Sequence, residues 1–278
     1  MGWTLSDDLD EFLAMTGGFL RDDPVRNTVA LTVTENMREQ GPGVYEDVLF
    51  GWWAPGGGVE GTVIRTAAYP PLLSAMPGRA ARELADALAE RGTAAGGASG
   101  SLAATEVFAD AWTRRTGTAS RVTMRQRLYR LGDLHVPDPP PEGAGRVAGP
   151  GDRALMLEWS AGFSRDAGDH GAVNTVVLDG RLDAGRIALW EAGGRPVSMA
   201  GWSPVVAGMS RISAVYTPAG DRRRGYGAAV TAEASKAAMD AGATEVVLFT
   251  DLANPTSNAV YQRLGYRPVE DRVMLAFD

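Results

Sequence analysis

Cysteine is absent from this sequence of 278 residues, so disulfide bonds and thiolate metal sites are excluded. Histidine is scarce: only His135 and His170 occur, which argues against a histidine metal site and against a Ser-His-Asp triad. No apolar run reaches the roughly 18 residues of a membrane-spanning helix. The first residues carry acids where a secretion signal carries basic residues. We therefore expect a protein without a metal ion, outside the membrane and in the cytoplasm.

Positive charge is also in short supply. The formal net charge is −7 and the pI is about 5.0, which argues against bulk attraction to nucleic acid or to an anionic membrane. The only lysine is Lys236, so nearly all cations are arginines. With 45% hydrophobic and 22% charged residues, the composition is typical of a globular protein with one large or two modest domains.

One short stretch concentrates arginine and glycine. A strand-like run containing Val215, Tyr216 and Thr217 ends at Pro218, and a long helical pattern begins a few residues later. The connection between them includes Arg222, Arg223, Arg224, Gly225, Tyr226, Gly227 and Ala228. Such a strand–loop–helix corner directs free backbone N–H groups and the positive end of a helix dipole at one point. The pattern predicts an anion site, most naturally for a diphosphate; the alternative is an exposed turn before a surface helix.

A second group of polar residues follows the apolar run at 245–249, which is typical of a strand covered on both faces. Asn254 precedes a short helical pattern in which Ser257, Asn258 and Tyr261 share one face. Open α/β sheets bind ligands at the C-terminal ends of their parallel strands, and this face lies there. The alternative is that Thr256 or Ser257 caps the helix and Tyr261 is an ordinary, half-buried core residue.

The rest of the chain alternates between helical and strand patterns. We expect breaks at Pro70-Pro71, a mobile glycine-rich loop at 93–100 and a proline-rich linker at 132–145. The expected helices are 4–21, one after Pro24, 79–91, 102–115, 151–164, 172–183, 225–241 and 256–264. The expected strands are 48–53, 61–68, 120–131, 186–191, 196–203, 210–217, 245–249 and 266–277.

The two halves of this pattern look like an internal repeat. Trp53 and Trp190 each precede a glycine turn, and the alanine-rich helix at 79–91 matches the one at 225–241. The sequence therefore predicts an α/β protein with two mixed-sheet halves in tandem, residues 1–135 and 143–278, and helices on both faces. Chance similarity between two α/β halves is the alternative.

The two motifs of the second half resemble one family. Arg222-x-x-Gly225-x-Gly227 directly after a strand resembles the acetyl-CoA loop of the GNAT (Gcn5-related) acetyltransferases, and the segment from Asn254 to Tyr266 resembles the tyrosine-bearing element of that family. A dinucleotide fingerprint would require a third glycine where Val230 stands, and no P-loop lysine follows. The resemblance implies a GNAT-like fold in both halves, with acetyl-CoA bound by the second half and none by a degenerate first half.

The resemblance also implies roles for single positions. The main chain of residues 215–217 would hold the pantetheine arm, and residues 222–228 would hold the diphosphate. Asn254 and Asn258 would lie along the arm, and Tyr261 would lie near the sulfur. Many family members carry a glutamate base on the central strand, but residues 199–204 contain no acid.

The implied activity is transfer of the acetyl group of acetyl-CoA directly to a primary amine of a small molecule or peptide. Tyr261 would be the general acid. The base stays open between a water chain and the acids Asp251, Glu191 and Glu158. The alternatives are an acyl-CoA-binding sensor without turnover and a nucleotide-binding module. We further expect a monomer or homodimer, with Tyr69 or the Trp52–Trp53 strand walling the acceptor site.

Overall fold

The computed structural model describes residues 2–167 and 173–278; His170 and the first residue of the helix expected at 172–183 lie outside the described residues. The first half contains β1 (Trp3–Ser6), α1 (Leu9–Asp22), α2 (Thr28–Gln40), η1 (Pro42–Val44), β2 (Leu49–Trp53), β3 (Gly61–Thr66), β4 (Tyr69–Leu73), α3 (Gly78–Glu90), β5 (Gly97–Ser101), α4 (Leu102–Thr116) and β6 (Ser120–Leu131). The second half contains β7 (Ala144–Val147), η2 (Pro150–Asp152), α5 (Arg153–Asp166), α6 (Thr175–Asp183), β8 (Ile187–Ala192), β9 (Arg195–Trp202), β10 (Met209–Tyr216), η3 (Ala219–Asp221), α7 (Tyr226–Asp240), β11 (Glu245–Asp251), α8 (Pro255–Arg263) and β12 (Tyr266–Phe277).

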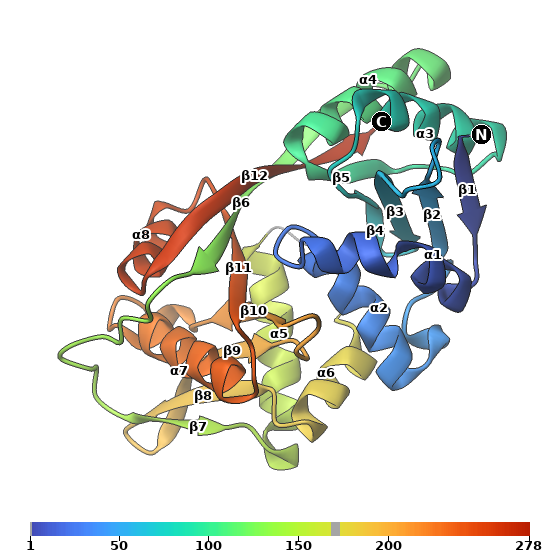
Figure 1. Ribbon diagram of the computed structural model, residues 1–278. Coiled ribbons are helices and arrows are strands. Elements are labelled where there is room, and N and C mark those ends of the chain that lie inside the picture. Colours follow the sequence, from blue (N-terminus) through green and yellow to red (C-terminus); the bar gives the residue numbers. More distant parts are fainter. Residues whose placement is uncertain (1, 168–172) are drawn as a thin grey trace.

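All the strands join in one mixed sheet of 12 strands, in the order β1-β2-β3-β4-β5-β12-β6-β11-β10-β9-β8-β7. The last strand of each half crosses into the other half: β12 pairs with β5, and β6 pairs with β11. β6 and β12 also pair with each other along most of their length, and run side by side through the middle of the molecule (Figure 1). The C-terminus consequently lies beside α3 and α4 of the first half (Figure 1).

Helices cover both faces of this sheet, which confirms the expected α/β architecture. In the second half, α7 and α8 enclose one buried cluster, while α5 and α6 enclose another on the opposite face. In the first half, α3 and α4 pack on one face and α1 and α2 on the other. The cluster under α1 and α2 also includes Met209 and Val247 of the second half. Helices of the first half therefore cover part of the central strands of the second half.

The glycine-rich segment expected as a mobile loop contains a central strand, β5. A Cβ on Gly97 would stand 2.0 Å from the carbonyl oxygen of Leu275, and one on Gly100 would stand 2.2 Å from that of Leu73. Only glycine permits these close approaches, so the glycines serve the packing of neighbouring strands and not a flexible loop. The prediction of a loop over 93–100 is wrong for residues 97–100 for this reason, while residues 93–96 lie outside any helix or strand.

The prolines expected to break the chain at 70–71 lie within β4. This strand pairs with β5 only through Leu72 and Leu73, so the prolines precede the parallel ladder. On the other side, the register with β3 shifts between Ile64 and Thr66, next to the prolines. A strand tolerates proline at such irregular or unpaired positions because no ladder N–H is required there.

Two boundaries also differ from those expected. The first helix begins at Leu9 and not at residue 4, because Asp8 caps it by accepting hydrogen bonds from the backbone N–H groups of Asp10 (2.8 Å) and Glu11 (3.0 Å). Residues 3–6 form β1 against β2 instead. The proline-rich linker ends before β7, whose Ala144 already pairs with Glu191 of β8.

Candidate functional site

The central strands β10 and β11 separate toward their C-terminal ends. Their parallel pairing stops after Ile212 and Leu248, although both strands continue. Ala214 has a φ of +51°, and the register between β9 and β10 shifts between Ser213 and Tyr216. Such a bulge bends a strand, whereas β11 keeps its pairing with β6 along residues 247–251. The edge of β10 that faces β11 therefore has no strand partner beyond Ile212.

The corner between β10 and α7 directly follows this unpaired part of β10. Gly225 is the N-cap of α7 with a φ of +87°, a conformation that favours glycine. A Cβ on Gly227 would meet nothing closer than the Thr217 hydroxyl oxygen, at 3.5 Å. Within the described parts of the chain, the backbone N–H groups of residues 223–227 donate to no protein acceptor. A helix N-terminus with free amides is suited to an anion, as the sequence predicts.

The three arginines of the corner differ in their contacts. Arg222 donates through Nη2 to Asp166 and through Nε to the carbonyl oxygen of Thr217 at 2.9 Å. Arg224 lies 4.0 Å from a carboxylate oxygen of Asp221. Arg223 is exposed and adopts a left-handed φ of +65°, which a residue with a side chain rarely does. Two of the three guanidinium groups thus help to shape the loop, and all three border the free amides.

An ion pair that the sequence did not point to holds the loop. Asp221, in η3, is buried and accepts two hydrogen bonds from Arg195, at 2.8 Å and 2.6 Å. The hydrogen bonds from Arg195 lower the pKa of Asp221, and the charge of Arg224 adds to this effect. Because Arg195 begins β9, the pair fastens the corner to the sheet. Spacing could not reveal it, since the partners are 26 residues apart.

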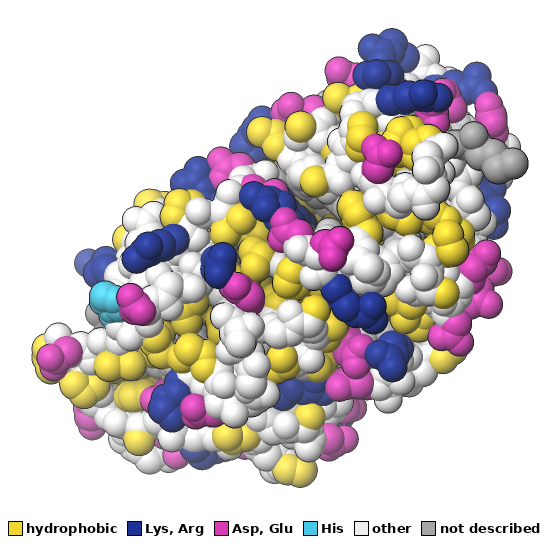
Figure 2. All heavy atoms as spheres, viewed as in Figure 1, with side chains coloured by type: hydrophobic (Ala, Val, Ile, Leu, Met, Phe, Trp, Pro, Cys, Tyr) yellow, Lys and Arg dark blue, Asp and Glu magenta, His cyan; other side chains and the backbone are white. Residues whose placement is uncertain are grey.

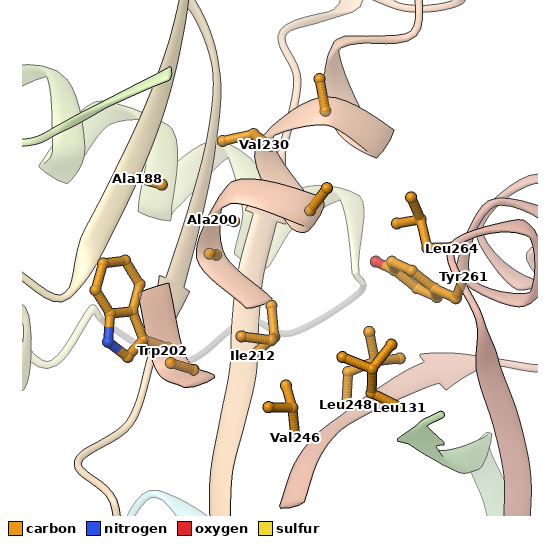
Figure 3. Packing of buried hydrophobic residues seen from close by; sticks show 14 of the residues in the cluster. Leu131, Ala188, Ala200, Trp202, Ile212, Val230, Val246, Leu248, Tyr261 and Leu264 are labelled. Atoms are coloured by element: carbon orange, nitrogen blue, oxygen red, sulfur yellow. The ribbon is translucent and has the colours of Figure 1, made fainter. Parts of the chain in front are cut away.

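The tyrosine of α8 packs in the buried cluster that also contains the first turns of α7. Tyr261 is 8% exposed and belongs to the buried cluster under α7. Its hydroxyl points toward the helix that carries Val230 (Figure 3) and has no hydrogen-bond partner in the described chain. Burial raises the pKa of Tyr261 to about 12, so the phenol is protonated at neutral pH. The structure therefore supplies a protonated hydroxyl whose proton is not committed elsewhere.

The two asparagines have local partners. The side chain of Asn254 caps α8 by accepting from the N–H of Ser257 at 3.0 Å. Asn258 donates to the carbonyl oxygens of Asp251 (2.8 Å) and Asn254 (2.7 Å), and accepts from the hydroxyl of Tyr129 at 3.0 Å. The amide of Asn258 is thus engaged within the protein, and contact of either asparagine with a pantetheine arm stays a prediction.

Tyr129 is the second residue that sequence reasoning missed. It lies on β6, in the first half of the chain, yet is fully buried in the cluster that contains Tyr261. Gln262 of α8 donates to its hydroxyl at 3.1 Å, while that hydroxyl donates to Asn258. The first half thereby positions the helix that carries Tyr261, through a strand that no local pattern assigns to the second half.

The acids left open as a base lie in different settings. Glu191 pairs with Arg146 at 2.8 Å, and Glu158 is exposed on α5. Asp251 ends β11 beside the gap, where its carboxylate accepts from the N–H of Ala253 at 2.8 Å. Asp251 is the one of the three at the opening between the strands.

The residues of the first half that we expect to wall the acceptor site differ in how exposed their side chains are. Trp52 and Trp53 are each only 4% exposed, so they belong to the core; Tyr69 is 50% exposed. The corner of the first half that corresponds to the arginine loop begins α3 after Pro77, which has no N–H to offer an anion.

The remaining surface is mixed in charge. On the face that Figure 2 shows, acidic and basic side chains are interspersed over both halves without a large area of one sign. Among the described residues, no group of three or more His, Asp or Glu side chains is arranged to hold a metal ion. None of the described helices combines the length and apolar character needed to cross a membrane.

Comparison with known proteins agrees with this geometry. Residues 192–275 match the family model described as FR47-like protein. A GNAT-family acetyltransferase from Colwellia psychrerythraea has a TM-score of 0.60 at 12% identity, with 100% of this chain and 99% of that chain covered. A GCN5-related N-acetyltransferase from Sphaerobacter thermophilus has a TM-score of 0.62 at 16% identity, covering 98% and 94%.

A third similar structure is a GCN5-related glucosamine N-acetyltransferase region of a fungal multi-domain β-N-acetylglucosaminidase. Its TM-score is 0.61 at 14% identity, with 98% of this chain and 38% of that chain covered. No curated protein matches the sequence. The separated central strands, the open corner before α7 and the family match at residues 192–275 lead to one assignment. The chain has the GNAT fold along its whole length, and its residues 192–275 match the FR47-like family model.

Proposed function

We propose that the protein is an acetyl-CoA-dependent N-acetyltransferase that acts on a primary amine of a small molecule or peptide. The observation that carries the proposal is that the free amides of residues 223–227 lie at the start of α7, and that the uncommitted, protonated hydroxyl of Tyr261 points toward this helix (Figure 3). A protein that only binds acyl-CoA has no need of a free protonated phenol at this place. The fungal region with the same fold is described as a glucosamine N-acetyltransferase, which is in keeping with an amine acceptor.

The residues present fit the parts of acetyl-CoA. The amides of residues 223–227 and the side chain of Arg223 would bind the diphosphate, since charge-assisted hydrogen bonds to phosphate are strong. The unpaired edge of β10 at residues 213–216 would bind the amide groups of the pantetheine arm. When bound, acetyl-CoA supplies an acetyl thioester that an amine can attack.

Tyr261 would then donate a hydrogen bond from its hydroxyl to the sulfur as negative charge develops there. A thiol has a pKa of about 8.5, so a phenol with a pKa of about 12 stays protonated beside the thiolate and stabilises its charge mainly as a hydrogen-bond donor. The acceptor has the opposite requirement, because an alkylammonium with a pKa near ~10.4 must lose a proton before it attacks. Asp251 or water at the opening would take that proton.

The test is turnover of a panel of amines with acetyl-CoA, followed by release of the CoA thiol and by the mass of the N-acetylated product. We expect Tyr261→Phe to lower turnover by about 10²–10⁴-fold, because a general acid contributes that much, with little change in acetyl-CoA affinity. Tyr266→Phe is the matched control: its ring packs edge-on against that of Tyr261, with 6.1 Å between centroids, but its hydroxyl is buried and bonded to that of Ser235. Turnover of Tyr261→Phe within about threefold of wild type would show that the proton comes from water.

A further inference from the structure

Two arginines meet on the opposite face of the central strands, across the sheet from α7. Arg211 lies on β10, two residues after Met209, which packs under α1 and α2. Alternate residues of a strand share a face, so Arg211 and Ser213 point toward α2. The contacts agree, since Nη2 of Arg211 donates to the hydroxyl of Thr32 on α2 at 2.8 Å.

Arg181 reaches the same place from α6. Its Nη1 lies 3.4 Å from the position that a Cβ on Gly201 would occupy. Gly201 pairs directly with Ser213 across β9 and β10, so the guanidinium of Arg181 lies beside Ser213. Its charge acts on Arg211, lowering the pKa of that residue in addition to the larger effect of burial.

Neither arginine has a carboxylate partner. Within residues 2–167 and 173–278, no acid lies within 4.0 Å of a guanidinium nitrogen of Arg181 or Arg211. The nearby acids of α2 are paired elsewhere, Glu35 with Arg38 and Glu39 with Arg186. Two partly buried like charges without a counter-ion among the described residues are costly, and an anion supplied by a ligand would offset that cost.

The polar atoms around the pair support the same conclusion. Among the described residues, Nε of Arg211 and the hydroxyl of Ser213 are buried and have no hydrogen-bond partner, and the side chain of Arg181 donates no hydrogen bond to any of them. Unsatisfied buried donors are rare in native proteins because each costs about 1–3 kcal/mol. A planar guanidinium presents paired donors that match an oxyanion.

The two arginines also lie close to the place where the parallel pairing of β10 and β11 ends. Ser213 is the first residue of β10 beyond the last parallel pair with β11. The corner that would hold the diphosphate begins after Thr217, further along the same chain. An acceptor whose anionic group lay between Arg181 and Arg211 would therefore place its amine near the opening from the side opposite α7.

We propose that the acceptor is an amine that also carries an oxyanion, and that Arg181 and Arg211 bind this group. The inference rests on the proposed N-acetyltransferase function and narrows its substrate class. Carboxylate and phosphate share the required chemistry, and the assays below separate them.

The first test compares kcat/KM within matched pairs of amines. One pair is 4-aminobutanoate and 4-aminobutanamide; the other is O-phosphoethanolamine and ethanolamine. We expect the anionic member of one pair to exceed its neutral partner by about 100-fold or more, because unpaired site donors penalise the neutral analogue. The pair that shows the preference identifies the anion.

Arg211→Gln and Arg181→Gln should each reduce the preference at least tenfold, while Arg38→Gln, an exposed arginine on α2, should preserve it. Equal kcat/KM within both pairs would overturn the inference without touching the proposed function.

The second test needs no turnover and applies equally if none of these amines is acetylated. Thermal unfolding is followed with succinate or inorganic phosphate and with chloride at the same ionic strength. We expect succinate or phosphate to raise the Tm of the wild type and not that of Arg211→Met. Without anion, Arg211→Met should be at least as stable as the wild type, because it removes an unpaired buried charge.

A destabilised Arg211→Met together with no anion effect on the wild type would show that both arginines are structural. Failure of every amine while acetyl-CoA still binds would count against the proposed function instead.

Discussion

The ion pair between Arg195 and Asp221 gives the sharpest prediction about the corner. Asp221 is 7% exposed at its side chain, whereas Arg195 is 59% exposed, so only one partner is shielded from water. Hydrogen bonds to charged groups contribute about 1.5–3 kcal/mol, while exposed pairs contribute about 0–1 kcal/mol. For this half-buried pair we expect Asp221→Asn to lower the free energy of unfolding by about 1.5 kcal/mol.

The same change should weaken acetyl-CoA binding. The free amides of residues 223–227 face one point only while the loop is held against β9. If only the closed form is competent and the variant loop is mostly open, a change of about 1.4 kcal/mol in the opening equilibrium weakens binding by up to about tenfold. Calorimetric titration of acetyl-CoA measures this loss directly.

A double-mutant cycle separates the pair from its surroundings. Urea unfolding of Asp221→Asn, Arg195→Gln and the double variant should show the double variant close to either single one, with a coupling of at least about 0.5 kcal/mol. Because Arg195 lowers the pKa of Asp221, this contribution is fully present above the unfolded pKa of about 3.9. It is lost as the pH falls below that value through the lowered folded pKa. Additive single effects at pH 7, or unchanged acetyl-CoA affinity, would refute the account of the corner.

The remaining predictions concern the shared strands and the acid. Tyr129→Phe should lower the free energy of unfolding by about 1–3 kcal/mol, because Asn258 loses the hydroxyl that donates to it. The same change should lower turnover more than acetyl-CoA affinity. Equal effects on kcat and KM would contradict a positioning role for Tyr129. Burial raises the pKa of Tyr261 to about 12, so its proton stays bound up to about that pH. We therefore expect kcat not to fall between pH 8 and about 10. A fall in kcat with an apparent pKa near ~9 would contradict this role of Tyr261. An isolated 143–278 fragment lacks β6 between β11 and β12, so we expect it not to fold as a monomer; a stable, fully active fragment would show otherwise.

The corner and α8 were predictable because their determinants are local. Arginines, glycines and the strand before them lie within about a dozen residues, and the helix periodicity places Tyr261 and Asn258 on one face. The strand β5 was missed because its glycines satisfy contacts with Leu73 and Leu275, which lie far away in the sequence. From composition alone, a glycine-rich segment is predicted to be a loop.

The partners across the halves could not be predicted for the same reason. Tyr129 enters the second half because β6 and β12 exchange places at the centre of the sheet. Arg181 and Arg211 meet through the register of Gly201 with Ser213, and Arg195 reaches Asp221 from the start of β9. A repeat in sequence predicts two similar halves, but it carries no information about which half supplies the strand between them.

The division into a cofactor-binding second half and a first half that binds none stays a prediction. Its physical basis is the contrast between the free amides before α7 and Pro77 before α3. A chain with one open corner has one place for a diphosphate, whereas two equivalent halves have two.

Calorimetric titration of acetyl-CoA into the wild type, Gly225→Val and Gly242→Val tests the central claim most directly. Both glycines have positive φ, +87° and +97°, so valine strains the backbone equally, but only Gly225 borders the free amides. The account predicts one acetyl-CoA per chain, with binding abolished in Gly225→Val and retained in Gly242→Val. Two sites per chain, or unchanged affinity in Gly225→Val, would contradict it.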